Sequence, residues 1–562
     1  MSLQSLKTAL KKPFGKHIID YFLLPNSDEF NSEYLPEYAK RLEFITNFTG
    51  SNAFAIISQE KSAFFTDSRY TLQSGSQVNK KDFDIFDLRE KSPLSWLEEN
   101  VQDSSKIGFD AKLHTISQIQ NYQKYFGENL IAINPNPIDD LWQNQPEPPQ
   151  TEVFGHALKY SGESSEAKIK KITADLESDA ILLTNPDSIC WLFNIRASDV
   201  ECTPLHLTFA IVSKNGSSQL FKSELPELPK SIKSISLDFK SANYWLFLEL
   251  NKLKITVLNQ PDPCAILKAV KNETEIENAI RIHKIDGLAL TKFLFWLEDS
   301  LAEKNPIDEL SATKKLLELR QENAEFLYPS FATIAGFESN GAIIHYQGTS
   351  KTNKDLKGNS LFLVDSGGQY QGATTDVTRT IAIGTPTAAM IQNFTRVLKG
   401  HITLARAKFP MGTQGGDLDV LARFHLWQAG LDYGHGTGHG VGSFSGVHEA
   451  PPSISKRIDG TPLQAGMILS NEPGFYEEGE YGIRIESLML VLDSKHKSFL
   501  GFKTLTLAPL DPSLIDFKMM TYPERKWLIN YHLEIFEELK DGLSLKEKSW
   551  LGDIVKKYQA QK

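Results

Sequence analysis

Two segments of the chain repeat one pattern: an apolar strand that ends at an acidic residue, a glycine-containing turn, and a strand that carries a second acidic residue. In the first segment the run LFLV ends at Asp365, and a strand rich in Thr, Val and Ile carries Asp376. In the second, MILSN ends at Glu472 and the returning strand IRIE carries Glu486. Antiparallel return would place the members of each pair side by side. The pattern predicts one hairpin used twice, as in an internally duplicated half-fold.

A glycine-rich histidine segment, YGHGTGHGVG, lies between the two acidic pairs. His435 and His439 are four residues apart, but glycine at every second position disfavours a helix. On an extended strand the two imidazoles share a face, and the glycines allow backbone or substrate to approach closely. His448, a short loop further on, is a candidate for proton handling.

Four carboxylates and an imidazole at one point predict bound cations. Without cations, mutual repulsion would drive some carboxylates to take up protons. Each residue alone has an ordinary explanation, because an Asp at a strand end is usually a turn residue or helix cap and a His among glycines is usually a loop residue. The ordered combination within about 120 residues is hard to meet by chance. It indicates a two-metal site.

Six motifs together resemble the pita-bread metallopeptidases, above all the long, three-domain aminopeptidase P type, which removes an N-terminal residue that precedes proline. The motifs are NGAIIHY at 340–346, VDSG at 364–367, TTDVTRT at 374–380, HGTGHGVG at 435–442, NEPG at 471–474 and GIRIE at 482–486. The resemblance covers nearly the whole chain and is most specific from about Lys268 onward. It implies a mixed α/β and α+β fold, with two creatinase-like N-terminal α/β domains followed by a pita-bread catalytic domain.

The resemblance also implies a metal-binding role for five residues. Asp365 would chelate one ion, His439 and Glu472 would bind the other, and Asp376 and Glu486 would bridge the two. Four ionised carboxylates carry about −4 and two divalent ions about +4, so the filled site would be close to neutral. Oxygen-dominated ligation with one imidazole and no thiolate favours Mn²⁺, with Co²⁺, Zn²⁺ and Fe²⁺ as alternatives.

Catalytic and substrate-binding residues follow from the same resemblance. Glu472 would act as a base, while His345 and His448 would hydrogen-bond the substrate carbonyl or the tetrahedral intermediate. The predicted substrate-binding residues are Arg69, His345, His435, His448 and Arg484. Arg69 would reach toward the substrate from the far wall of the cleft, although a surface arginine at a strand end explains it equally well.

The predicted reaction is hydrolysis of the N-terminal Xaa-Pro bond of peptides. Two metal ions about 3.5–4 Å apart can share a water and present hydroxide to a polarised carbonyl, so no protein nucleophile is required. Proline has no N–H, and its ring restricts the preceding residue. Proteases that hydrogen-bond the scissile N–H are therefore handicapped at this bond.

Composition adds limits rather than specificity. At 562 residues and 41% hydrophobic, the chain is long enough for several domains, and its net charge of −10 argues against nonspecific nucleic-acid binding. Cys190, Cys202 and Cys264 form no CxxC motif and are expected to be reduced thiols. The start of the chain lacks an apolar signal region and no long apolar stretch follows, so we expect a cytoplasmic protein without a membrane partner. A homodimer, formed through the third domain and the tail, is the family-based expectation.

Four domains are predicted from composition and periodicity. A Pro/Gln-rich stretch at 143–150 separates domain I (1–147) from domain II (148–260), and the catalytic domain (261–510) is followed by a helical extension (511–562). The residues Asn272 to Glu275 form a capping box at the start of a long helix. His283 lies within that helix and is predicted to be structural.

Three positions depart from the family pattern, and three other functions remain open. Ala197, Thr203 and Asn471 stand where Gly, Asn and Asp are common, and Asn471 could change the electrostatics around the metal site. Prolidase, a dipeptidase of the same fold, is the nearest alternative. Creatinase has the fold without metals, and noncatalytic pita-bread modules have lost ligands, whereas this chain keeps the full ligand set.

Overall fold

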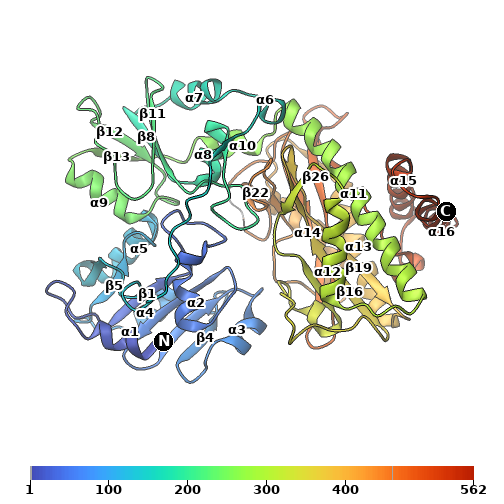
Figure 1. Ribbon diagram of the computed structural model, residues 1–562, viewed down its shortest axis with the longest axis horizontal. Coiled ribbons are helices and arrows are strands. Elements are labelled where there is room, and N and C mark those ends of the chain that lie inside the picture. The colour runs from blue at the N-terminus through green and yellow to red at the C-terminus, as the bar shows by residue number, and fades with distance from the viewer. Residues whose placement is uncertain (1–2, 458–459, 562) are drawn as a thin grey trace. The chain divides into compact units, whose positions relative to one another are not determined.

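The computed structural model describes residues 3–457 and 460–561, which fold into two compact units (Figure 1). One unit consists of Met1–Gly155 and Glu163–Cys264, and the other consists of His156–Gly162 and Ala265–Lys562. Each unit combines several sheets with helices. None of the helices that the structure describes is long and apolar enough to span a bilayer.

The first unit contains two mixed sheets around a shared hydrophobic core. The larger sheet consists, in spatial order, of β4 (Phe83–Asp87), β3 (Ser62–Thr66), β2 (Ala53–Ser58), β1 (Tyr21–Pro25), β5 (Ile107–Asp110) and β6 (Leu130–Ile133). The smaller sheet consists of β11 (Ser218–Phe221), β10 (Phe209–Ser213), β8 (Ala180–Leu183), β12 (Ser234–Leu237) and β13 (Thr256–Asn259). Within the larger sheet, β2 and β3 are antiparallel neighbours. Phe109 and Phe209, from different sheets, lie in one apolar cluster.

The helices of this unit precede or connect its strands. They are α1 (Leu3–Leu10), α2 (Arg41–Thr46), α3 (Thr71–Gln77), α4 (Pro93–Asn100), α5 (Ile116–Phe126), α7 (Ser165–Ala174), α8 (Pro186–Phe193) and α9 (Tyr244–Lys252). Strands β7 (Phe154–Gly155) and β9 (Ile195–Arg196) pair antiparallel and form a separate two-stranded sheet. The boundary to the second unit falls at α10 (Cys264–Ala269).

The second unit repeats an order of two helices followed by antiparallel strands. The first repeat begins with α11 (Glu273–Ala302) and α12 (Glu309–Gln321), and the second with α13 (Ala388–Ala405) and α14 (Gly415–Trp427). Figure 1 shows these four helices alongside the strands of the unit. This order supports the duplicated half-fold expected from the two acidic hairpins.

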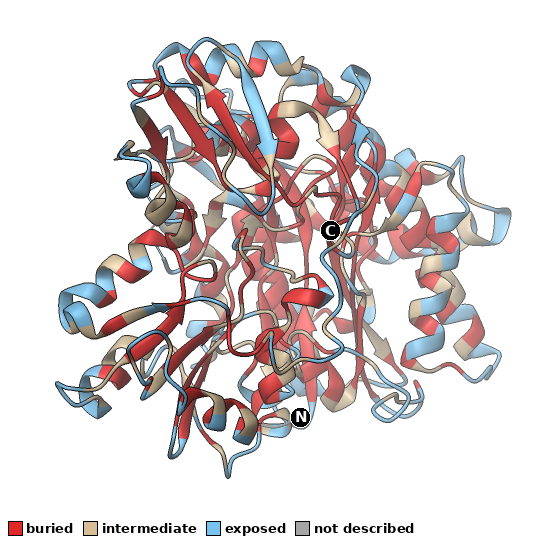
Figure 2. Ribbon diagram, turned by 60° about the vertical axis from the view of Figure 1, so that its left-hand side comes forward, coloured by how far each residue is buried: buried red, intermediate tan, exposed pale blue. Residues whose placement is uncertain are grey.

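The strands of the two repeats form separate sheets. The first repeat has the sheets β15 (Ile334–Phe337), β16 (Ser360–Ser366) and β19 (Val377–Ile383), and β14 (Phe326–Pro329), β17 (Gly368–Tyr370) and β18 (Ala373–Thr374). The second has a six-stranded sheet of β20 (Lys408–Pro410), β27 (Phe499–Thr504), β26 (Ser487–Asp493), β23 (Ile468–Asn471), β21 (Gly438–Gly440) and β22 (Glu449–Ile454), and a hairpin of β24 (Gly474–Glu477) and β25 (Tyr481–Arg484). Figure 2 shows buried residues along the strands and an exposed side on many helices.

Helix α11 begins at the predicted capping box. Asn272 Oδ1 accepts from the Glu275 backbone N–H, and Glu275 Oε2 accepts from the Asn272 N–H, both at 3.0 Å. These bonds satisfy N–H groups that the first helical turn leaves free. His283 is buried on the same helix and its Nδ1 lies 2.7 Å from Ala279 O, which agrees with a structural role.

The tail is helical, as predicted, and consists mainly of α15 (Tyr522–Leu539) and α16 (Leu545–Gln559). The ring of His532 stacks on that of Tyr558, with centroids 3.9 Å apart. The Tyr531 hydroxyl accepts from Arg379 Nη2 at 2.9 Å, which ties α15 to strand β19. The tail therefore packs onto the rest of the second unit as part of its core.

Candidate metal centre

The first acidic hairpin changes partners at its two aspartates. Strands β16 and β19 pair antiparallel, with Asp365 opposite Thr378, and the chain then continues into the inner pair of β17 and β18. Asp376 lies in the break between β18 and β19, so the single strand predicted through it was wrong. Gly367 allows this crossing, because a Cβ there would meet Thr375 O at 1.9 Å.

The second acidic hairpin has the same construction. Strands β23 and β26 pair with Asn471 opposite Ser487, and β24 and β25 form the inner hairpin. Glu472 and Glu486 directly follow and precede the outer strands, so the strand predicted through 483–486 is also broken. The Glu486 backbone N–H donates to Thr378 O at 3.1 Å, and this bond joins the two hairpins at their acidic ends.

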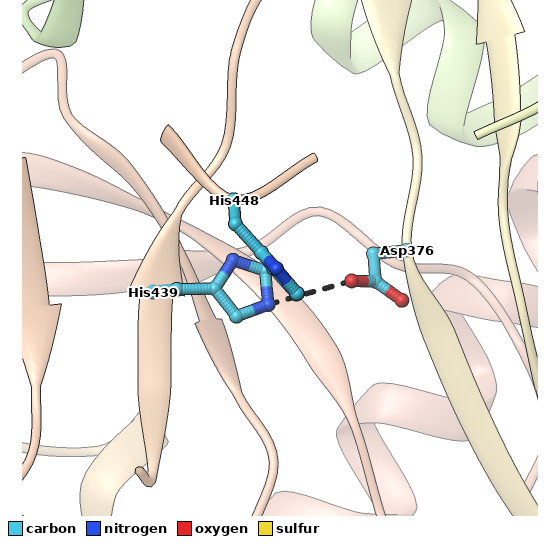
Figure 3. A group of neighbouring side chains, drawn as sticks. All are labelled: Asp376, His439 and His448. Carbon is cyan, nitrogen blue, oxygen red and sulfur yellow. Dashed lines mark ion pairs between the residues drawn. The ribbon is translucent and has the colours of Figure 1, made fainter. Parts of the chain in front are cut away.

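The four carboxylates and His439 converge at this junction. Three overlapping groups each have ligand atoms within 4.8 Å of one another: Asp365, Asp376 and Glu486; His439, Glu472 and Glu486; and Asp376, His439 and His448. Glu486 belongs to two groups, as does Asp376. Figure 3 shows Asp376 and His448 around the His439 ring. The arrangement can hold two cations that share carboxylates.

The imidazole of His439 is oriented for cation binding. Its Nδ1 lies 2.9 Å from Gly440 O and donates to it in the neutral tautomer, which leaves the Nε2 lone pair facing the carboxylates. Nε2 lies 3.4 Å from Asp376 Oδ2 and 3.5 Å from Glu472 Oε1. Burial alone would lower the pKa of His439, but Asp376 and Glu472 raise it to about 9. The neighbouring carboxylates therefore favour positive charge at this position.

The carboxylates are deficient in protein hydrogen-bond donors. Asp365 Oδ1, Asp376 Oδ1 and Glu486 Oε1 are buried without a hydrogen-bond partner in the part of the chain that the structure describes. Burial, together with the charge of Asp376, raises the pKa of Asp365 to about 7 despite Arg484. Burial and the neighbouring carboxylates also raise the pKa of Glu486. Buried carboxylate oxygens without donors fit divalent cations, which supply the missing positive charge.

Arg484 lies behind Asp365 and is only 1% exposed. Its Nη2 donates to Asp365 Oδ2 at 2.6 Å and to Ile344 O at 3.3 Å, and its Nη1 donates to the Tyr476 hydroxyl at 2.7 Å. The Tyr476 hydroxyl in turn lies 2.8 Å from His435 Nε2. These contacts indicate that Arg484 holds Asp365 in place. They give less support to the predicted role of Arg484 in substrate binding.

The remaining predicted residues occupy different surroundings. His448 faces the His439 ring, with centroids 4.3 Å apart at 72°. His345 is half-buried and lies in the loop after the 3-10 turn Glu338–Ala342. Arg69 belongs to the first unit, where its Nη2 lies 2.7 Å from Asp67 Oδ2. Its role in substrate binding stays a prediction.

Family comparisons bear on this centre. Residues 277–493 match the model of metallopeptidase family M24, and residues 498–558 match the C-terminal region of that family. A probable Xaa-Pro aminopeptidase P of Laccaria bicolor is 37% identical, over 94% of this chain and 89% of the relative. The chain belongs to metallopeptidase family M24. Residues 7–141 and 144–227 each match a creatinase/prolidase N-terminal domain, as expected for the two domains before an M24 domain.

Other similar proteins cover the M24 chain nearly end to end. A probable Xaa-Pro aminopeptidase P of Coprinopsis cinerea is 36% identical, over 94% of each chain. The solved X-prolyl aminopeptidase of Caenorhabditis elegans, described as a cytosolic enzyme with a di-nuclear active site, is 30% identical. It superposes with a TM-score of 0.90 over 98% of each chain. The predicted family and fold are thus confirmed.

Two residues that support this M24 site escaped the sequence analysis. Thr378 Oγ1 donates to Glu486 Oε2 at 2.8 Å and accepts from Arg484 Nε at 3.2 Å. Tyr476 links Arg484 to His435. Thr378 lies in the motif TTDVTRT, two residues after the predicted ligand Asp376, and this position was the available signal. A lone tyrosine such as Tyr476 offers no comparable signal.

Proposed function

We propose that the protein is a metal-dependent aminopeptidase that hydrolyses the N-terminal Xaa-Pro bond of peptides. The observation that carries the proposal is the pair of overlapping ligand groups, joined through Glu486, with buried carboxylate oxygens that lack protein donors. The names and coverage of the relatives supply the substrate class. Membership of family M24 and this donor-poor cluster together favour hydrolysis over a noncatalytic role.

Two divalent ions would be held by five residues. Asp365 would bind one ion, His439 and Glu472 the other, and Asp376 and Glu486 would bind both. This assignment is supported by the grouping of the same residues in space. Oxygen donors with one imidazole favour Mn²⁺, with Co²⁺, Zn²⁺ and Fe²⁺ as alternatives.

When bound, the two ions would activate a water and polarise the substrate carbonyl. Glu472 would accept a proton as base, and Ser470 Oγ, 3.3 Å from Glu472 Oε1, orients its carboxylate. His448 would hydrogen-bond the substrate oxygen from beside His439, and His345 would do so from its loop. His435 would bind substrate next to Glu472, whose Oε2 lies 3.8 Å from His435 Nδ1.

Peptides of graded length test the function. The Mn²⁺-loaded enzyme is expected to release the free N-terminal residue from Xaa-Pro-Xaa and from longer peptides, while peptides with Ala in place of Pro serve as the matched control. Metal analysis of the same sample should give two ions per chain. Cleavage of Xaa-Pro dipeptides alone would identify a prolidase, and absence of all cleavage by the metal-loaded protein would indicate a binding module.

We also propose a homodimer in the cytosol. Helix α14 exposes Val420, Phe424 and Trp427, which lie on one face at spacings of four and three residues. An exposed apolar face of this kind suits a second copy of the catalytic unit. Sedimentation should show a dimer, and Phe424→Glu should shift it toward monomer.

Domain boundaries at 147, 260 and 510 are proposed on the composition of the chain.

A further inference from the structure

The buried carboxylate of Glu309 organises the loop that carries His345. Glu309 is the first residue of α12 and is 1% exposed. Its Oε1 accepts from the Phe337 backbone N–H at 2.7 Å and from Asn340 Nδ2 at 2.9 Å. Its Oε2 accepts from the Tyr346 hydroxyl at 3.0 Å and from the Lys354 backbone N–H at 3.1 Å.

All four donors come from one segment of the chain, residues 337–354. The carboxylate has no ion pair among the residues described, so these donors and the start of α12 balance its buried charge. A buried charge that loses a donor is costly, because the freed lone pair has no water to replace it. The segment is therefore held in one conformation around Glu309.

The same segment is attached to the metal centre on its other side. Arg484 Nη2, which binds Asp365, also donates to Ile344 O at 3.3 Å. Gly341 and Gly482 approach so closely that a Cβ on Gly482 would meet Gly341 O at 1.7 Å. His345 lies between Ile344, bound by Arg484, and Tyr346, bound by Glu309.

We propose that Glu309, acting through the Tyr346 hydroxyl, is a positioning residue that holds His345 at the metal centre. The inference rests on the role proposed for His345 in binding the substrate oxygen. Glu309 lies 36 residues before His345 in sequence, and among the residues described it forms no hydrogen bond with any of the five ligand residues. Its effect on the reaction would therefore pass through the loop.

The test is a double-mutant cycle in the full-length, Mn²⁺-loaded enzyme with an Xaa-Pro-Xaa peptide. His345→Ala is expected to lower kcat about 10²-fold, as loss of an oxyanion donor does. Tyr346→Phe should lower kcat about tenfold with little change in KM, because His345 shifts while substrate binding persists. In the His345→Ala background, Tyr346→Phe should have no further effect.

Tyr558→Phe is the matched control. Tyr558 lies on α16, and the substitution removes a buried hydroxyl that donates to Leu510 O at 3.0 Å. It should leave kcat unchanged. Glu309→Gln should lower kcat more than Tyr346→Phe if it folds; Tyr346→Phe provides the measurement if it does not. An equal loss from Tyr346→Phe in both backgrounds, or no loss in either, would overturn the positioning role. Unchanged kcat in His345→Ala would instead overturn the role proposed for His345.

Discussion

Two sites in the catalytic unit balance buried carboxylates differently: Asp286 with its donors, which we call the closed cluster, and the metal centre, which we call the open cluster. Asp286 on α11 is closed by protein donors: its Oδ1 accepts from Arg320 Nε and from the Tyr370 hydroxyl, both at 2.8 Å, and its Oδ2 accepts from Arg320 Nη2 at 3.2 Å. At the metal centre, Asp365 and Asp376 each keep a buried oxygen without a partner among the described residues. The difference lies in the donors that the fold supplies.

The two clusters also differ in charge balance. Burial would raise the pKa of Asp286, but Arg320 lowers it below the ordinary value. The pKa of Asp365 is instead raised to about 7 by burial and by Asp376, although Arg484 is close. Tyr370, which closes the Asp286 cluster, lies on β17, only five residues after Asp365. The closed cluster stabilises the fold, because protein donors balance its buried charge. The open cluster has buried negative charge that bound cations would balance.

The largest expected effect comes from removing a charge in the open cluster. Asp376→Asn keeps the shape of the side chain but removes the charge of a carboxylate that belongs to two of the three ligand groups. We expect kcat/KM to fall by a factor on the order of 10³ or more, since metal activation supplies several kcal/mol. Steady-state kinetics with metal analysis would measure it. Full activity in this variant, or in chelated enzyme, would refute the proposed chemistry.

The corresponding change in the closed cluster should affect stability. Asp286→Asn leaves Arg320 buried without its partner and should cost about 3–5 kcal/mol in the free energy of unfolding. Urea unfolding measures this, and kcat per folded molecule should be retained. Asp553→Asn, which breaks an exposed pair with Lys556, is the control and should leave the urea midpoint nearly unchanged. Loss of kcat at unchanged stability would contradict the comparison.

Metal removal should affect the stability of variants in the two clusters differently. Mn²⁺ at 100 times its Kd should stabilise the native protein by about 2.7 kcal/mol, because it binds the folded site. Thermal unfolding with and without chelator would show the shift. Asp286→Asn should keep the shift, whereas Asp376→Asn should lose most of it. An equal shift in both variants would mean that Mn²⁺ binds elsewhere.

The smallest expected effect is the pH dependence of the free energy of unfolding that arises from the buried imidazole of His532. Burial lowers the pKa of His532 to about 3, with a smaller contribution from Arg379. The unfolded chain takes up this proton near pH 6.5, so the stabilisation is complete above that pH and is lost as pH falls toward 3. The loss should reach about 2 kcal/mol at pH 5. Unfolding at pH 8 and pH 5 should show a smaller difference in His532→Gln; an unchanged difference would exclude His532 as its source.

Local patterns predicted much of the catalytic unit. The capping box at Asn272 and Glu275 was confirmed, because its two hydrogen bonds join residues three apart. The tail helices were also confirmed, since apolar spacing determines which face of a helix is buried. The strand breaks at Asp376 and Glu486 were missed. They arise because each chain segment changes pairing partner there, and pairing depends on strands distant in sequence.

The sequence by itself determined the ligand types, their order and the strands that end at them, because these depend on residue identity and short-range periodicity. The tertiary structure decided which carboxylates are closed and which are open. Arg320 reaches Asp286 from another helix, and Arg484 reaches Asp365 from the other hairpin. Such contacts join residues 34 and 119 positions apart, and only packing of the core sets them.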